Sequence, residues 1–244
     1  TGGAVRYRGQ NLLGLSAPER RAYRGRAISM IFQDALSSLN PVFPVGWQIA
    51  EMFRIHEGLS RRDATARAVD LMDRVRIPAA KARASDYPHQ FSGGMRQRIM
   101  IAMAIALDPD VLIADEPTTA LDVTVQAQVM ELLADLQQET GMGLVLITHD
   151  LGVVTEVADR AAVMYAGRIV ETGTVRSVFT RPAHPYTLGL RRSIPSLEAR
   201  SGKLEPIQGA PEPHQHPVGL PVPPPVPVRD PGLPGRGPAA AGGR

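Results

Sequence analysis

The chain has 244 residues, 43% of them hydrophobic and 21% charged, and a formal net charge of +3. These values are ordinary for a globular protein, and so small a charge is at most a weak indication of a nucleic-acid or acidic-membrane partner. The absence of cysteine excludes disulfides, thiolate metal sites and a cysteine nucleophile. No apolar run is long enough to cross a bilayer, and the opening TGGAVRYRGQ has neither an initiator methionine nor a signal-peptide pattern. We therefore expect one domain with a real core, beginning in mid-domain, followed by a tail.

The first elements are short. Alternating apolar residues predict a strand and a turn up to Gly9, and the polar segment 16–26 predicts a short helix or a loop. The apolar run Ile28–Phe32 predicts a buried strand that ends at Gln33. Prolines in ALSSLNPVFPVG (35–46) predict a loop there.

Two helices are expected in the middle of the chain. Ser60 and Asp63 form a capping-box pattern, and the helix that they begin ends before Pro78. A second apolar helical pattern, MRQRIMIAMAIAL (95–107), follows the sequence FSGG and is bounded by Pro109. The apolar face of the first helix consists of Ala68, Leu71, Met72 and Val75.

The second half of the chain alternates strand and helix. VLIA (111–114) is apolar on both faces, as a central parallel strand should be, and GLVLIT (143–148) predicts a second buried strand. Between them lies an amphipathic helix that ends at Gly141, and a later hairpin turns at Ala166-Gly167. The apolar face of that helix consists of Val125, Val129, Leu132, Leu133 and Leu136.

Alternating strands and helices predict an α/β domain with a mostly parallel sheet, in which ligands bind beyond the carboxyl ends of the strands. Four polar residues are predicted at or just past such ends: Gln33, Asp115, Glu116 and His149. Their shared placement is the main structural indication of a site.

The adjacent carboxylates can carry chemistry. Asp115 can hold Mg²⁺, because a hard cation prefers oxygen ligands, and Glu116 can act as a general base toward a water that attacks a phosphate. An isolated pair is more often a solvated start of a loop. Gln33 can coordinate Mg²⁺ or orient water, and His149 can donate to a phosphate oxygen, but each alone is more often structural.

FSGGMRQR is a candidate anion site. Ser92 can cap a helix that begins around Met95, while Gly93 and Gly94 let a ligand approach the backbone. Basic side chains in the first turn oppose the helix dipole, so we expect an anion or an acidic partner beside Arg96 and Arg98. An ordinary loop-to-helix junction is the alternative.

Taken together and in this order, these motifs resemble the ATP-binding cassette (ABC) ATPases over roughly residues 1–195. The resemblance implies a P-loop NTPase-like nucleotide-binding domain with a helical signature subdomain. By it, Glu116 and His149 are catalytic and Asp115 and Gln33 bind Mg²⁺. The residues that the same resemblance assigns to ATP binding are Ser92, Gly93, Gly94, Gln33 and Asp122.

The family also implies partners. Its ATPases work as head-to-tail dimers, in which the signature of one subunit closes over ATP held by the other. An SGG terminus is not expected to reach the carboxylate pair of its own chain, because the two face outward on separate subdomains. Permease subunits, and indirectly a substrate-binding protein, would be further partners at the cytoplasmic face of the cell membrane, where the subunit is peripheral; nucleic acid is not expected.

Two stretches resemble oligopeptide and dipeptide importer ATPases, whose relatives also serve nickel and glutathione. They are QDALSSLNPV (33–42) and RPAHPYTLGLRRSIP (181–195). Peptide import is therefore the expected process. A non-catalytic module that completes a partner's ATP site, and a DNA-repair or translation-type ABC ATPase, are the alternatives.

The phosphate loop GxxxxGK[ST] is not found in these 244 residues. The only lysines are Lys81, which no glycine precedes, and Lys203, which Leu204 follows in place of Ser or Thr. In the family the loop lies upstream of the position that Thr1 matches, so we expect an N-terminally truncated cassette with little ATPase activity alone.

The expected organisation is an ABC ATPase domain at 1–180 with a helical subdomain at 45–110. A peptide-importer-type extension at 181–210 and a low-complexity tail at 211–244 follow. The tail is rich in Pro and Gly and is expected to be disordered, as a native linker or as the product of a shifted reading frame.

Overall fold

A computed structural model describes residues 3–34 and 38–192. The predicted tail at 211–244 and most of the predicted extension at 181–210 lie outside these residues. Within the described part of the chain, no helix is both long and apolar enough to cross a membrane.

The N-terminal segment forms a small hairpin and a helix. Strands β1 (Arg6–Tyr7) and β2 (Gln10–Asn11) pair in antiparallel fashion, and a 3-10 turn (Leu12–Gly14) and helix α1 (Ala17–Tyr23) follow. The predicted strand and turn are thus confirmed, and the polar segment forms a helix. Tyr7 and Arg8 both donate hydrogen bonds to the carboxylate of Asp110, which joins the hairpin to the residue before strand β4 (Val111–Asp115).

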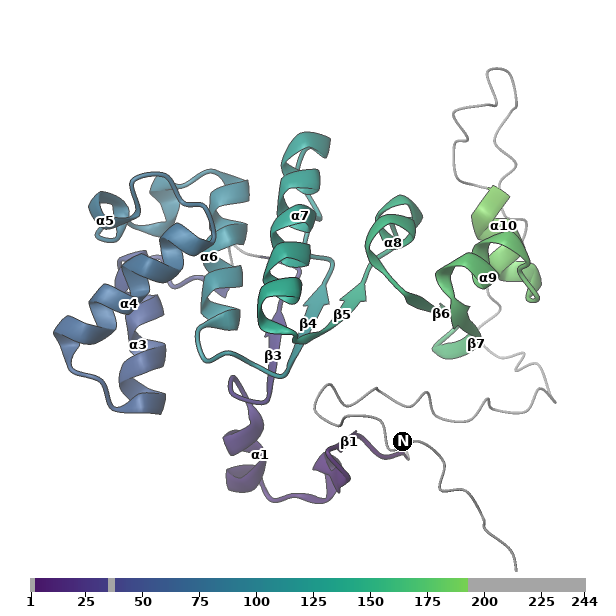
Figure 1. Cartoon of the computed structure of the whole chain (residues 1–244), viewed down its shortest axis with the longest axis horizontal. Helices are drawn as coiled ribbons and strands as arrows, with labels where there is room; N and C mark the ends of the chain where they lie inside the picture. The colour runs from purple at the N-terminus through teal and green to yellow at the C-terminus, as the bar shows by residue number, and fades with distance from the viewer. Residues whose placement is uncertain (1–2, 35–37, 193–244) are drawn as a thin grey trace, which may run out of the picture. The chain divides into compact units, whose positions relative to one another are not determined.

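A group of helices follows the first parallel strand (Figure 1). Helices α3 and α4 pack along each other, and α6 contacts both. Helix α3 was not predicted, although its buried Val45, Ile49 and Phe53 recur at helical spacing. The elements of this group are α3 (Val45–Glu57), α4 (Arg61–Arg74), α5 (Ala80–Arg83), a 3-10 turn (Pro88–Gln90) and α6 (Gly93–Ile105).

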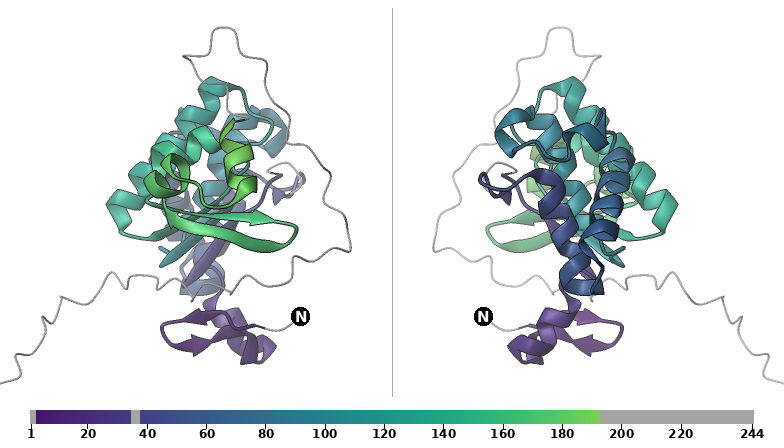
Figure 2. Two further views of the ribbon diagram at one scale, coloured as in Figure 1. Left: turned by 90° about the vertical axis from the view of Figure 1, so that its right-hand side faces the viewer. Right: turned by 90° about the vertical axis from the view of Figure 1, so that its left-hand side faces the viewer.

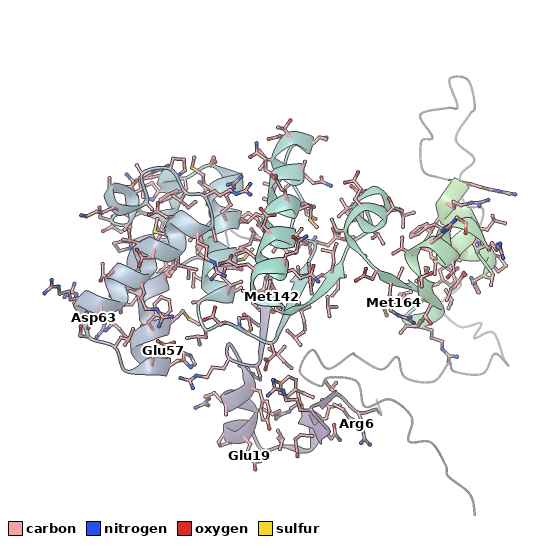
Figure 3. The ribbon with its side chains drawn as sticks, in the orientation of Figure 1. Arg6, Glu19, Glu57, Asp63, Met142 and Met164 are labelled. Atoms are coloured by element: carbon pink, nitrogen blue, oxygen red, sulfur yellow. The ribbon has the colours of Figure 1, made fainter. Side chains whose placement is uncertain are left out.

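Helix α4 begins as its sequence predicts. Ser60 Oγ accepts a hydrogen bond from the backbone N–H of Asp63 at 3.2 Å and donates to the Asp63 carboxylate at 2.7 Å. Glu57, the last residue of α3, forms an ion pair with Arg67 of α4. Figure 3 labels Glu57 and Asp63 at the two ends of the connection between these helices. The predicted apolar face, from Ala68 to Val75, is buried.

Three parallel strands form the sheet that positions the site. Strand β4 (Val111–Asp115) lies between β3 (Ile28–Ile31) and β5 (Gly143–Ile147), which confirms the predicted parallel sheet and central strand. Leu112 and Ala114 are fully buried in one cluster with apolar residues of α6 and α7. Helix α7 spans Val123–Thr140 and ends, as predicted, at Gly141 in the left-handed conformation.

Strand β5 departs from its prediction. It is an edge strand in the described part of the sheet, with Val145 49% and Ile147 47% exposed. The expectation of a buried strand is therefore wrong. An apolar sequence cannot specify which of two parallel strands lies at the edge of the described sheet, because that depends on strand order.

The last described elements pack on a second hairpin. Strands β6 (Arg160–Tyr165) and β7 (Arg168–Thr174) pair in antiparallel fashion, and the hairpin turns at Ala166 and Gly167 as predicted. Both turn residues have positive φ. Helix α9 contacts both strands and α10 contacts α9 (Figure 2). The helices of this region are α8 (Leu151–Val157), α9 (Val175–Thr180) and α10 (Pro185–Arg192).

Candidate functional site

The predicted site residues follow the carboxyl ends of adjacent strands. Ile31 pairs with Ala114, and Asp115 pairs with Ile147. Gln33, Asp115, Glu116 and His149 therefore come from one edge of the sheet, where the parallel strand ends meet. This is the placement that the sequence predicts.

Glu116 and His149 are in direct contact. The Glu116 Oε1 atom lies 2.7 Å from the His149 Nδ1 atom and also accepts the His149 backbone N–H at 3.1 Å. The backbone N–H of Glu116 donates to the Ile147 carbonyl at 2.9 Å, and Glu116 has a positive φ of 50°. Left-handed backbone of this kind costs about 1–3 kcal/mol and is concentrated at functional positions.

A further hydrogen bond reaches the other oxygen of the Glu116 carboxylate. The Thr119 hydroxyl donates to the Glu116 Oε2 atom at 2.9 Å, so both oxygens of Glu116 have donors. Thr119 was not identified from the sequence. The spacing of three residues within a turn is the signal that could have found it.

The pKa values of the pair move apart. Partial burial raises the pKa of Glu116, but the hydrogen bonds from His149 and Thr119 outweigh burial, and its pKa is lowered overall. The hydrogen bond to Glu116 raises the pKa of the His149 imidazole, whose side chain is 81% exposed. The arrangement therefore favours a carboxylate beside a protonated imidazole.

Asp115 and Gln33 offer the oxygen ligands that Mg²⁺ prefers. Asp115 is the last residue of β4, and Gln33 follows the end of β3, the neighbouring strand. The described residues contain no group of three or more His, Cys, Asp or Glu side chains that could hold a metal ion. The donor set fits a Mg²⁺ ion that takes its other ligands from phosphate oxygens and water.

A hollow of about 300 Å³ opens beside this edge. Its lining brings the segment after β3 together with the start of α6 and the loop before α7. Gly93 thus lies close to residues that follow Glu116, although neither Asp115 nor Glu116 lines the hollow. The lining residues are Gln33, Asp34, Gly93, Arg96, Gln97, Thr119, Ala120 and Leu121.

The glycine pair begins α6. The helix starts at Gly93, two residues before the predicted Met95, and Ser92 is its N-cap, accepting from the Met95 N–H at 3.4 Å. A Cβ atom on Gly94 would lie 2.4 Å from Val125 Cγ1, whereas one on Gly93 would lie 3.6 Å from Leu121 Cδ2. Gly94 is thus needed for the close approach of α6 to α7, whereas a Cβ atom on Gly93 would make only an ordinary van der Waals contact.

The two arginines of this turn have partners of an unexpected kind. Arg96 Nε donates to the Pro88 carbonyl at 2.8 Å, and Arg98 donates to the Gln128 amide oxygen at 2.9 Å. Backbone and amide oxygens thus meet these guanidinium groups, where an anion or an acidic partner was expected.

Asp122 is the N-cap of α7 and accepts from the Val125 N–H at 2.9 Å. One turn later, Gln126 donates to Asp150, the residue after His149, at 2.8 Å. Sequence reasoning missed Gln126, because nothing in a helical glutamine indicates a partner 24 residues away.

The segment that resembles peptide importers has a clear anchor. The Glu171 carboxylate on β7 accepts the backbone N–H groups of Ala183 at 2.8 Å and His184 at 3.0 Å. Tyr186 packs against Tyr165 with ring centroids 4.5 Å apart. The sequence HPYT (184–187) therefore docks on the β6–β7 hairpin and starts α10.

Comparison with known proteins gives two family matches. A model described as "ABC transporter" matches residues 1–119, and one described as "Oligopeptide/dipeptide transporter, C-terminal region" matches residues 170–220. The second match extends past residue 211, where the composition changes.

Relatives and a solved structure agree with these matches. A protein of Brucella abortus (strain 2308), named as a peptide import ATP-binding protein, is 56% identical over 219 residues, which are 89% of this chain and 66% of that protein. A Brucella melitensis protein with the same description is 52% identical over 218 residues, covering 85% of this chain and 64% of its own length. The chain thus spans slightly less than two thirds of the length of these curated relatives.

The solved structure is a dimer of the ATP-binding cassette MJ0796 bound to ADP and Pi. It has a TM-score of 0.64 and 28% identity, with 72% of this chain and 75% of that chain covered. The fold, the motif order and both family matches therefore agree: the chain is similar to the ABC transporter family over residues 1–119 and to the oligopeptide/dipeptide transporter C-terminal region over residues 170–220.

Proposed function

We propose that the chain is the ATP-binding and ATP-hydrolysing subunit of an importer of peptides. The observation that carries this proposal is the contact of Glu116 with His149 at the sheet edge that Asp115 shares. The names of the Brucella relatives and the match over residues 170–220 support peptides as the cargo.

In the proposed reaction, Glu116 acts as the general base. It accepts a proton from a water whose oxygen attacks the γ-phosphorus of ATP, while the bond to the β,γ-bridging oxygen breaks and ADP leaves. As long as His149 and Thr119 both donate to the carboxylate, its basicity is reduced. Transfer of the His149 hydrogen bond to a phosphate oxygen would restore that basicity when nucleotide is present.

ATP and Mg²⁺ would be held by groups from two subunits. Asp115 and Gln33 would supply oxygen ligands to Mg²⁺, which neutralises phosphate charge. Ser92, Gly93 and Gly94 would present the positive end of α6 to ATP on a partner subunit, and Asp122 would lie beside it. The dimeric arrangement of MJ0796 with ADP and Pi supports this head-to-tail assembly.

Permease subunits are the proposed partners at the membrane, with a substrate-binding protein acting through them. Val42 is 68% exposed, and the neighbouring Phe43 stacks on Trp47 with ring centroids 4.4 Å apart. These apolar side chains, held at the start of α3, suit contact with a permease loop. The proposed location is the cytoplasmic face of the membrane, without insertion.

The missing phosphate loop limits what the 244 residues can do alone. Without a lysine that directly follows a glycine and holds the phosphates, we expect weak ATP binding and almost no ATP turnover by the pure chain. The alternative function is a non-catalytic module that completes the ATP site of a partner, and only the lack of GxxxxGK[ST] in these residues favours it.

A mixing experiment tests both functions. The chain is added to an ABC ATPase subunit that carries its own phosphate loop but has a disabled SGG motif, and ATP hydrolysis is measured. Restored hydrolysis is expected from the chain, and loss from Gly93→Asp, which places a carboxylate where phosphate would bind. Equal rates with Gly93→Asp would show that the start of α6 does not face ATP. Substantial turnover by the chain alone would refute its dependence on a partner.

A further inference from the structure

One side chain connects the start of α7 to the turn that carries His149. The backbone N–H of Gln126 donates to the Asp122 carbonyl at 2.8 Å, within the first turn of α7. Its side-chain Nε2 donates to the Asp150 Oδ2 atom at 2.8 Å, and this contact is partly buried.

Asp150 uses its other oxygen to begin α8. The Oδ1 atom accepts from the N–H of Gly152 at 2.9 Å and of Val153 at 3.4 Å. The backbone N–H of Asp150 donates to the Thr148 hydroxyl at 3.0 Å. His149 therefore lies between two residues that bond to each other, and Gln126 fixes this turn from outside.

His149 itself is held at its backbone as well as its ring. Its N–H and its Nδ1 atom both face Glu116 Oε1, so a shift of the turn would lengthen both contacts. The imidazole is mostly exposed, and packing alone does not fix it. The Asp150–Gln126 contact supplies the restraint that packing lacks.

We propose that Gln126 is a positioning residue that, through Asp150, holds His149 against Glu116 and ties this pair to the start of α7. Two segments donate to the Glu116 carboxylate: the turn that carries His149 and the loop that carries Thr119. Asp122, the N-cap of α7, follows that loop directly. A displacement of the first turn of α7 would thus move the His149 turn with it. The inference rests on the proposed function for its catalytic meaning, but the geometry that it claims is independent of ATP.

The test uses the 244-residue chain at neutral pH and reads the ring nitrogens of His149 by ¹⁵N NMR, with amide hydrogen exchange at Gly152 and Val153. Gln126→Glu places two carboxylates in contact and should release the turn. The double variant Gln126→Glu with Asp150→Asn restores the hydrogen bond with donor and acceptor exchanged, since the new amide at position 150 can donate to the new carboxylate at position 126 and still cap α8. Gln128→Glu is the matched control, because Gln128 lies two residues away and its oxygen accepts from Arg98.

For Gln126→Glu we expect loss of the Nδ1 hydrogen-bonded signal of His149 and about tenfold faster exchange of the two amides. Both should return to wild-type values in the double variant and stay unchanged in the control. An unchanged His149 signal in Gln126→Glu, or no rescue in the double variant, would overturn the inference. Because neither readout needs hydrolysis, failure of the proposed ATPase function would leave this result intact, and failure here would leave the ATPase proposal standing.

Discussion

The two glycines of the signature differ in what surrounds them. Gly94 faces Val125 of α7 at a separation that a methyl group would reduce to 2.4 Å, but Gly93 has room for one at 3.6 Å from Leu121. Both residues lie in the first turn of α6, so their effects on helix formation are similar. One glycine is thus explained by packing, and only the other is left for a ligand.

Substitution of these glycines separates packing from function. Gly94→Ala should lower the free energy of unfolding by about 1–3 kcal/mol, because the added methyl group overpacks the contact of α6 with α7. Gly93→Ala should leave the free energy within about 0.5 kcal/mol of wild type. Urea unfolding measures both, and equal losses in the two variants would contradict the assigned packing.

The Glu116–His149 contact has a pH signature. NMR titration should place the pKa of His149 above its ordinary value, and Glu116→Gln should return it toward that value because the carboxylate is removed. A raised pKa contributes stability below the unfolded-state value, and this contribution is lost as pH rises through the folded-state value. The lowered pKa of Glu116 contributes above its unfolded-state value and is lost as pH falls.

An identical pKa of His149 in wild type and Glu116→Gln would show that the pair is not formed in solution. The His184 ring, whose Nδ1 atom accepts from the Tyr186 N–H, is the internal reference.

At the scale of elements, the Glu171 anchor decides how the last described helices are held. Its carboxylate accepts two backbone N–H groups from the segment before α10. Partial burial raises the pKa of Glu171, but the hydrogen bonds that it accepts outweigh burial and lower it overall. The stability that it contributes is therefore present above the unfolded-state pKa and is lost as pH falls through the folded-state value.

Glu171→Gln should cost about 1 kcal/mol at neutral pH, since an amide NH₂ must face one of the two N–H groups and solvent weakens the remaining bond. The loss should shrink in acid, where the wild-type carboxylate is protonated. Thermal unfolding at several pH values measures it, with Glu156→Gln on α8 as the control. A loss that does not change with pH would rule out the carboxylate as the anchor.

Local sequence patterns predicted most helices and strands, and they predicted that Glu116 and His149 lie at the same edge of the sheet. Ser60, Gly141 and Ala166-Gly167 mark ends and turns by their own chemistry, and the order of parallel strands brought Glu116 and His149 to one edge. Helix α3 was missed because Pro41 and Pro44 predicted a loop up to residue 46, although both precede the helix and Pro44 is its N-cap. The exposure of β5 and the Gln126–Asp150 bond depend on partners distant in sequence, which local periodicity does not encode.

For the whole molecule, the central claim is that Glu116 is the base of an ATP site that a phosphate loop GxxxxGK[ST] would complete. A segment of an ABC ATPase that carries GxxxxGK[ST] can be fused ahead of Thr1, the position that the family resemblance indicates. The 56% identity to longer Brucella relatives makes their corresponding segments the natural donors.

The most direct measurement is ATP hydrolysis by this fused protein and by its Glu116→Gln variant, with nucleotide binding measured in parallel. The fused wild type should hydrolyse ATP, and Glu116→Gln should lower the turnover number by about 10²–10⁴-fold with ATP affinity retained, because it removes the base and leaves the phosphate contacts. Turnover of the variant within a few-fold of the wild type, or no turnover by a folded wild-type fusion that binds ATP, would contradict the assignment of Glu116 and of the site.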